Sequence, residues 1–167
     1  MNLDIIFTHL DITTTDYIDI KSTINLYLVS KSIGVQIKKK LYKKIAENSS
    51  NSIIQASKNG NCCFLDWFKN SGLKFKYTSN TIDYASWNSH IVVLDWFKNS
   101  GLEFKYTSDA IGWASRNGHI IVLDWFKNSG LEFKYTSYAI DHASKNGHIV
   151  ILDWFKISGL VVRFDFL

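Results

Sequence analysis

The sequence contains no proline, one methionine and only two cysteines. The two cysteines, Cys62 and Cys63, are adjacent, and neighbouring cysteines rarely form a disulfide because the bridge would be strained. The cysteines and histidines also lack the spacing of a metal site. We therefore expect no disulfide framework, no metal and no cofactor, a pattern typical of a reducing compartment.

Long apolar runs are missing as well, since none approaches the roughly 18 residues that a membrane helix needs. The first residues, MNLDIIFTHLD, include acids and a histidine but no basic leader, so they do not resemble a signal peptide. The formal net charge of +4 is mild and does not by itself imply a nucleic-acid partner. We expect an intracellular protein that is not secreted and does not bind a membrane.

The strongest feature that is present is a repeat with a period of 29 residues. The segment LDWFKNSG or LDWFKISG begins at Leu65, Leu94, Leu123 and Leu152. The repeat region, 49–167, therefore contains about four units, whereas residues 1–48 do not match the repeat. The four units span 51–79, 80–108, 109–137 and 138–167.

Each unit has the pattern of two short helices joined by a turn. Ile82 and Ala85 are three residues apart with Ser86 beside them, which predicts one buried stripe of small residues on the first helix. One unit cannot bury enough apolar surface to fold alone, so we expect the units to stack. The predicted N-caps of the first helices are Ser50, Ser79, Ser108 and Ser137. The predicted left-handed C-caps of the second helices are Gly101, Gly130 and Gly159.

The stretch AIDHASKNGHIVILDWF, with its Gly147–His148 pair, resembles the ankyrin repeat, and the resemblance covers 51–159. It implies an all-α, ankyrin-type solenoid of stacked helix-turn-helix repeats behind an N-terminal helical cap. Ala110 and Ala139 stand where the family has proline, and each repeat is about four residues short in the β-hairpin finger. This contracted form looks like the ankyrin-repeat proteins of giant amoebal DNA viruses, which implies a host protein as partner, in the host cytoplasm or nucleus.

The units differ from one another on one face of the first helix, opposite Ile82 and Ala85, at helical offsets zero, three, four and seven. In the ankyrin resemblance this is the concave face, where partners bind, and aromatic residues and arginine are typical of interface hot spots. We therefore expect a non-catalytic protein-binding scaffold, with drift at solvent positions as the alternative. The differing residues are Asn80, Asp109 and Tyr138; Asp83, Gly112 and Asp141; Tyr84, Trp113 and His142; and Trp87, Arg116 and Lys145.

Other residues recur in the units and could indicate chemistry. The recurring Ser86, His90 and Asp95 resemble the residue types of a catalytic triad, but their return in later units favours a structural role, so we expect no enzyme. We expect the recurring histidines to form hydrogen bonds at the turn between helices, because they are too far apart to share a metal. The tryptophans could stack on bases, but their fixed place in the second helix favours packing. They are Trp67, Trp96, Trp125 and Trp154.

Three smaller expectations concern single sites. We expect Cys62 and Cys63 to be small buried hydrophobic residues rather than redox sensors. Asp95 and Lys98 are expected to form a surface pair within one helix. The lysine run at 38–44 could bind nucleic acid or anionic lipid, but a solvated helix face is the favoured interpretation and nucleic acid the less favoured partner.

The two ends of the chain differ from the repeat. Residues 1–48 faintly resemble an F-box, which implies a Skp1-like adaptor as partner and a role of the repeats in presenting substrates to a host ubiquitin ligase; a helical cap is the alternative. The docking residues would be Leu3, Ile6, Phe7, Leu10 and Val29. After Gly159 the sequence VVRFDFL replaces the repeat's EFKYTS. Either this tail folds back over Trp154 or the last repeat pairs with another copy.

Overall fold

The computed structural model describes Lys44 and residues 48–160, and this part of the chain is helical with no strand. The predicted adaptor-docking residues, the lysine run apart from Lys44, and the tail 161–167 lie outside the described residues. The described helices are α4 (Ser49–Lys58), α5 (Cys62–Asn70), α6 (Asn80–Trp87), α7 (Ile91–Asn99), α8 (Ser108–Arg116), α9 (Ile120–Asn128), α10 (Ser137–Lys145) and α11 (Ile149–Ser158).

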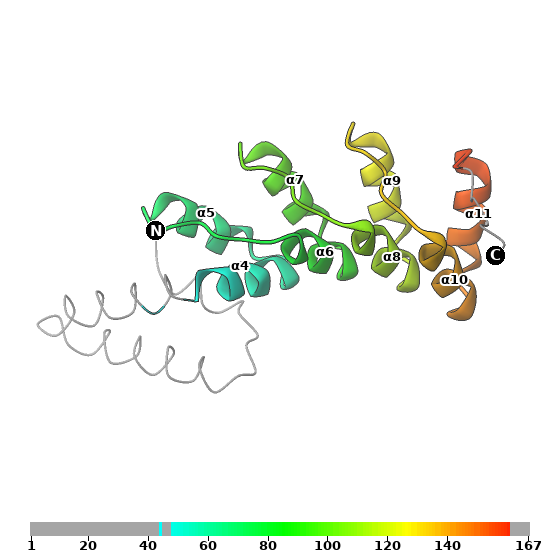
Figure 1. Cartoon of the computed structure of the whole chain (residues 1–167), viewed down its shortest axis with the longest axis horizontal. Helices are drawn as coiled ribbons and strands as arrows, with labels where there is room; N and C mark the ends of the chain where they lie inside the picture. The colour runs from blue at the N-terminus through cyan, green and yellow to red at the C-terminus, as the bar shows by residue number, and fades with distance from the viewer. Residues whose placement is uncertain (1–43, 45–47, 161–167) are drawn as a thin grey trace, which may run out of the picture.

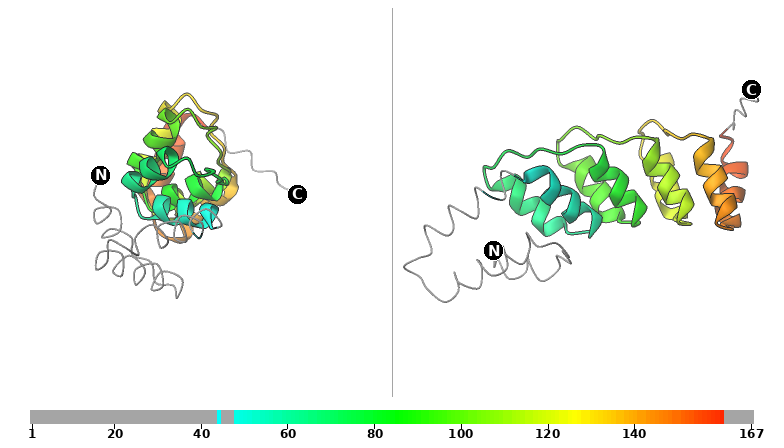
Figure 2. Two further views of the ribbon diagram at one scale, coloured as in Figure 1. Left: turned by 90° about the vertical axis from the view of Figure 1, so that its left-hand side faces the viewer. Right: turned by 60° about the horizontal axis from the view of Figure 1, so that its bottom comes forward.

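The helices form four pairs in a row, one pair for each sequence unit (Figure 1). The first helices, α4, α6, α8 and α10, lie side by side along one edge, and the second helices, α5, α7, α9 and α11, lie above them. Extended segments link one pair to the next along a common edge of the row (Figure 2). The first helices pack against one another much more extensively than the second helices do, so the row is most closely packed on its first-helix side.

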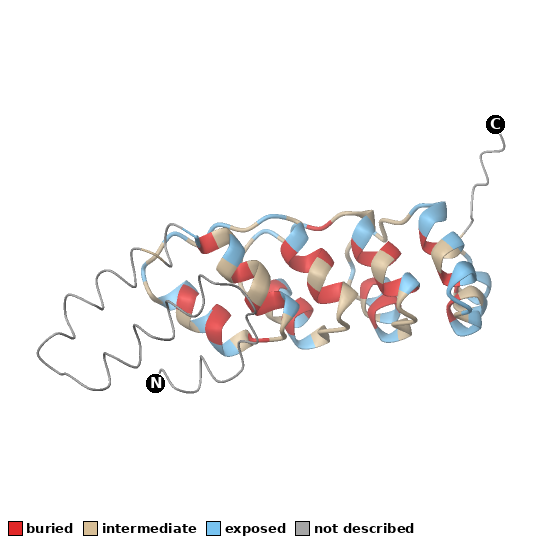
Figure 3. Cartoon of the chain, turned by 90° about the horizontal axis from the view of Figure 1, so that it is seen from below, coloured by how far each residue is buried: buried red, intermediate tan, exposed pale blue. Residues whose placement is uncertain are grey.

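The first helices approach closely because their shared face is built from small residues. Ile82 and Ala85 of α6 are fully buried, as are Ile111 and Ala114 of α8, which confirms the stripe expected from the spacing. Each second helix adds a large side chain, and Phe68, Phe97 and Phe126 are also fully buried. Viewed from the first-helix side, the buried positions lie between neighbouring helices along the row (Figure 3).

The helix ends agree with the sequence at the C-caps but not at the N-caps. Gly101, Gly130 and Gly159 follow the second helices with φ of 75°, 77° and 72°, which confirms the left-handed caps. Ser108 and Ser137 are instead the first residues of α8 and α10, and Ser50 lies inside α4. Ser79 is the N-cap of α6 but makes no capping hydrogen bond. The threonine before the serine takes the cap in α8, where Thr107 Oγ1 accepts from Asp109 N at 3.1 Å.

The turn inside each pair contains a left-handed residue, and at Gly60 and Gly118 the histidine of the next pair lies against it. A Cβ atom on Gly118, where φ is 74°, would lie 2.9 Å from His148 Nδ1. Ser89 takes the same place in the second unit with φ of 59°, the one positive-φ residue other than glycine in the described part. The turn therefore holds successive pairs in register.

Candidate functional site

The side chains that recur in every unit join neighbouring helix pairs. Trp125 Nε1 donates to Asp95 Oδ1 at 2.7 Å, and Trp96 donates in the same way to Asp66. The ammonium group of Lys98 lies 5.8 Å from the Trp125 ring centroid. We call this set of contacts between successive second helices the seam. The half-buried tryptophans also pack against the core, so the interpretation as packing residues is confirmed.

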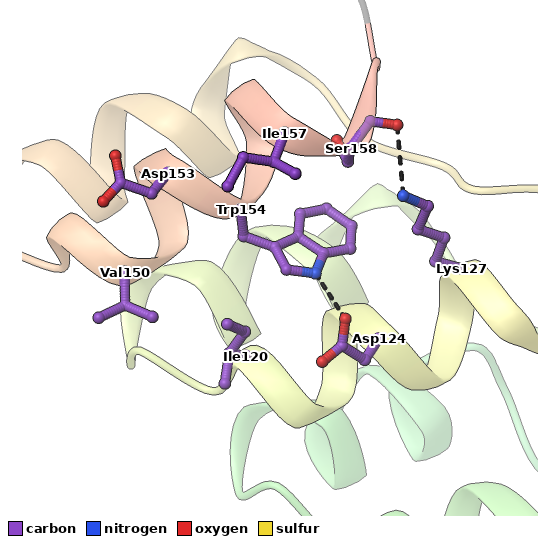
Figure 4. Close-up of a pocket in the computed structure, with 8 residues that line it drawn as sticks. All are labelled: Ile120, Asp124, Lys127, Val150, Asp153, Trp154, Ile157 and Ser158. Carbon is purple, nitrogen blue, oxygen red and sulfur yellow. Dashed lines mark hydrogen bonds between the residues drawn. The ribbon is translucent and has the colours of Figure 1, made fainter.

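Figure 4 shows the last described step of the seam, between α9 and α11. Trp154 Nε1 donates to Asp124 at 2.6 Å, and Lys127 Nζ donates to the Ser158 carbonyl at 3.3 Å. An open cleft of about 400 Å³ lies beside this contact. The cleft is lined by Ile120, Asp124, Lys127, Val150, Asp153, Trp154, Ile157 and Ser158. Ile157 is 84% exposed at its rim, and oligomerisation through this last unit stays a prediction.

The residues that resemble a triad are each bonded to the scaffold. Ser86 is buried and its hydroxyl donates to the Ile82 carbonyl at 2.9 Å. His90 Nε2 lies 2.9 Å from the Lys58 carbonyl of the preceding pair, which confirms the hydrogen bond expected at the turn. Asp95 accepts from Trp125, so Asp95 and Lys98 both contact this ring of the next unit. Each of these three groups therefore has a hydrogen-bond partner outside the trio.

Neither cysteine is fully buried as expected, although Cys62 packs against the core as a partly buried residue. Cys62 is half-buried and its thiol lies 3.5 Å from the Val92 carbonyl, whereas Cys63 is exposed. Burial, together with the charges of Asp66, Cys63 and Asp95, raises the pKa of Cys62 to about 11. The Cys62 thiol is thus protonated at neutral pH, which makes it a weak nucleophile. In residues 48–160 no group of three or more histidine, cysteine or acidic side chains could hold a metal ion.

An aromatic cluster lies on the outward side of the first helices and consists of Tyr84, Trp87 and Trp113. The Trp87 and Trp113 ring centroids are 5.0 Å apart, and those of Tyr84 and Trp113 are 5.3 Å apart. All three rings are half-buried, so each keeps part of its surface open to solvent. The Arg116 guanidinium lies 5.9 Å from the Trp87 ring centroid, and Lys58 Nζ lies 5.9 Å from that of Tyr84. The structure therefore brings together four of the predicted residues and adds Lys58.

A second aromatic contact lies on the next helix of the row. The ring centroids of Tyr138 and His142 are 3.8 Å apart on α10. Tyr138 also covers Gly112, where an added Cβ would lie 2.9 Å from Tyr138 Cδ1. Gly112 is buried and is unavailable to a partner, although it varies among the units. Glycine here therefore makes room for the tyrosine of the next unit.

Asp83 differs from the expectation of an exposed side chain, because it is only 1% exposed. Its carboxylate accepts from Thr107 N and from Thr107 Oγ1, both at 3.0 Å. Burial raises the pKa of Asp83 to about 6, although the hydrogen bonds from Thr107 act in the opposite direction. Asp83 therefore joins α6 to the start of α8 and is unavailable to a partner. Six of the predicted residues on this face are exposed, unlike Asp83. They are Asn80, Asp109, Arg116, Tyr138, Asp141 and Lys145.

Lys58 was missed because the first unit was left out of the comparison between units. It occupies the position of Trp87, Arg116 and Lys145 one unit earlier, so the 29-residue period would have found it. None of the described helices is both long and apolar enough to cross a membrane. No model of a known family, no curated protein and no solved structure matches the chain.

Proposed function

We propose that the chain is a non-catalytic, protein-binding scaffold of ankyrin type, and that the outward side of α6, α8 and α10 holds the partner. The observation that carries this proposal is the cluster of Tyr84, Trp87 and Trp113, which is partly open and differs from unit to unit. Large aromatic side chains and arginine contribute most of the binding energy in many interfaces. The stack does not require tryptophan at these positions. In the last unit the position of Trp87 is Lys145 and the position of Trp113 is His142.

The arrangement of helices supports the ankyrin-type interpretation. Four helix-turn-helix pairs stack with one shared orientation, and the first helices form the more closely packed side of the row. A row that is closest packed on one side curves toward that side, and curved repeat arrays present concave binding surfaces. The aromatic cluster lies on these first helices, so a partner would contact several units at once.

The test is partner capture with the full chain and a triple variant, Trp87→Ala with Trp113→Ala and Arg116→Ala. These side chains are exposed or half-buried, so we expect the free energy of unfolding to fall by only about 1–2 kcal/mol. Capture of the partner from a host-cell lysate is expected to disappear. The measurement is quantitative mass spectrometry of the captured proteins beside chemical denaturation of each variant.

The matched control changes an apolar stripe of the second helices. Val92, Ile121 and Val150 are 59%, 54% and 63% exposed on α7, α9 and α11. Replacement of all three with alanine is expected to leave capture unchanged. If the triple variant of the first helices keeps the same partners while the control variant loses them, the proposed face is wrong.

A further inference from the structure

The cations of the first-helix side lie in one row along the array. Lys58, Arg116 and Lys145 are the last residues of α4, α8 and α10, and Trp87 is the last residue of α6. The three cations are exposed. We call these four residues the terminal row. Because each residue comes from a different unit, the terminal row runs along the array and not along a single helix.

The acids of these helices lie away from the terminal row, in the first turn or near the middle of the helix. Asp109 is in the first turn of α8, seven residues before Arg116, and Asp141 is near the middle of α10. Asp83 of α6 is buried and holds Thr107, so it adds no exposed charge. The edge of the surface at the helix C-termini is therefore positive, and the aromatic cluster borders it. Arg116 links the two features directly, since its guanidinium lies over the Trp87 ring.

We propose that the terminal row binds an extended, acidic segment of the partner protein, with one aromatic or large apolar residue of that segment seated on the aromatic cluster. This inference rests on the proposed function and adds the chemistry of the ligand. Carboxylates complement the three exposed cations. The rings of Tyr84, Trp87 and Trp113 offer apolar surface to a single large side chain between the charges.

The distance between neighbouring helices sets the number of ligand residues between the apolar anchor and each carboxylate. Packed helices lie about 10 Å apart and an extended chain advances about 3.3 Å per residue, so one unit corresponds to about three ligand residues. The ligand places its apolar anchor at Trp87 and one carboxylate about three residues away, opposite Lys58. On the other side of the anchor, carboxylates about three and six residues away meet Arg116 and Lys145.

A polypeptide fits this surface better than a nucleic acid does. A nucleic acid carries one negative charge at every nucleotide, whereas the terminal row has three cations interrupted by Trp87. Asp109 and Asp141 are exposed on the same helices and would repel further phosphates. A peptide can place neutral residues opposite these acids, so it satisfies the pattern of charges along the row.

The experiment measures binding of fluorescent synthetic peptides to the full chain by anisotropy. The test peptide has a tryptophan anchor, one glutamate about three residues to one side, two glutamates about three and six residues to the other side, and neutral polar residues elsewhere. A second test peptide has the same sequence in reverse order, because the direction of the bound chain is not specified. The control peptide has the same composition with its glutamates adjacent. We expect the spaced peptide to bind about tenfold more tightly than the control. A single-stranded oligonucleotide of equal net charge is measured beside them.

Charge reversal identifies the residues that make the contact. Arg116→Glu with Lys145→Glu is expected to weaken binding of the spaced peptide about tenfold, with circular dichroism showing an unchanged fold. A peptide with lysine in place of the two matching glutamates is expected to regain that tenfold on the reversed variant. This rescue separates direct contact from a loss of folding.

Three outcomes would overturn the inference: equal affinity for the spaced and control peptides, no rescue by the lysine peptide, or tighter binding of the oligonucleotide. The proposed function has a separate test. If the alanine triple variant loses its partner while glutamate spacing has no effect, the scaffold proposal stands and the acidic ligand is wrong. If the triple variant keeps its partner, the first-helix face itself is wrong, whatever the peptides show.

Discussion

The seam and the first-helix face are built from the same repeat, yet they differ in what the repeat keeps constant. In the seam, aspartate, tryptophan and lysine recur because each contacts the neighbouring pair, as Asp95 and Lys98 contact Trp125. On the first-helix face, the position of Trp87 carries lysine or arginine in the other units. Constancy at these positions therefore accompanies contacts between pairs, whereas the exposed variable positions of the first helices are those that the stack does not constrain.

The largest expected effect comes from comparing an aromatic residue buried between helix pairs with one on the first-helix face. Phe126 is fully buried between pairs, so Phe126→Ala is expected to lower the free energy of unfolding by about 3–5 kcal/mol. Trp113 is half-buried on the face, and Trp113→Ala is expected to cost only about 1 kcal/mol. Urea denaturation followed by circular dichroism measures both. Equal losses would show that the aromatic cluster is structural, which would weaken its assignment to binding.

The sequence predicted those features that depend on one unit alone. The spacing of Ile82 and Ala85 within a helix is enough to identify the buried stripe, and glycine is enough to identify the left-handed C-caps. Three of the four predicted N-caps were wrong, and Ser79 alone was placed correctly. At α8 the adjacent residues Thr107 and Ser108 can both cap a helix, and only the backbone geometry selects between them.

The burial of Asp83 could not be predicted from the period of its own helix. Helical spacing places it with Tyr84 and Trp87 on the outward face, but Thr107, the N-cap of α8 in the following helix pair, donates to its carboxylate. That contact depends on the path of the extended segment before α8, which the pattern of apolar residues does not describe. A position that varies between units is therefore exposed only where no residue of the neighbouring helix pair contacts its side chain.

Asp83 also makes the contact between α6 and the start of α8 sensitive to pH. Its pKa is raised from 3.8 to about 6 in the folded chain, so the folded state binds the proton more tightly than the unfolded state. Its contribution to stability is therefore full below pH 4 and is lost as the pH rises through 6. We expect this loss to be roughly 1–3 kcal/mol.

The Asp83→Asn variant isolates this effect because asparagine has nearly the same shape and no charge. His119 acts in the opposite direction, since burial lowers its pKa and its protonation destabilises the fold as the pH falls below 6.5. The measurement is the difference between wild-type and variant unfolding free energies from pH 4 to pH 7. That difference should change in favour of the variant as the pH rises; a constant difference would show that Asp83 ionises normally.

The smallest expected effect is the difference in stability loss between Asp95→Ala, inside the seam, and Asp153→Ala, at the same position of the last described helix. Asp95→Ala removes the acceptor of the Trp125 indole, and we expect a loss of about 1 kcal/mol because a half-buried donor then bonds only to water. Asp153 occupies the same place in α11, where it is exposed and accepts no hydrogen bond from another described residue, so Asp153→Ala is expected to change the stability of this chain by less than about 0.5 kcal/mol. Thermal unfolding of the two variants measures the contrast. If Asp95→Ala lowers stability no more than Asp153→Ala does, aspartate recurs for a reason other than its hydrogen bond to tryptophan. A residue that is constant between units would then no longer identify a contact that holds the stack together.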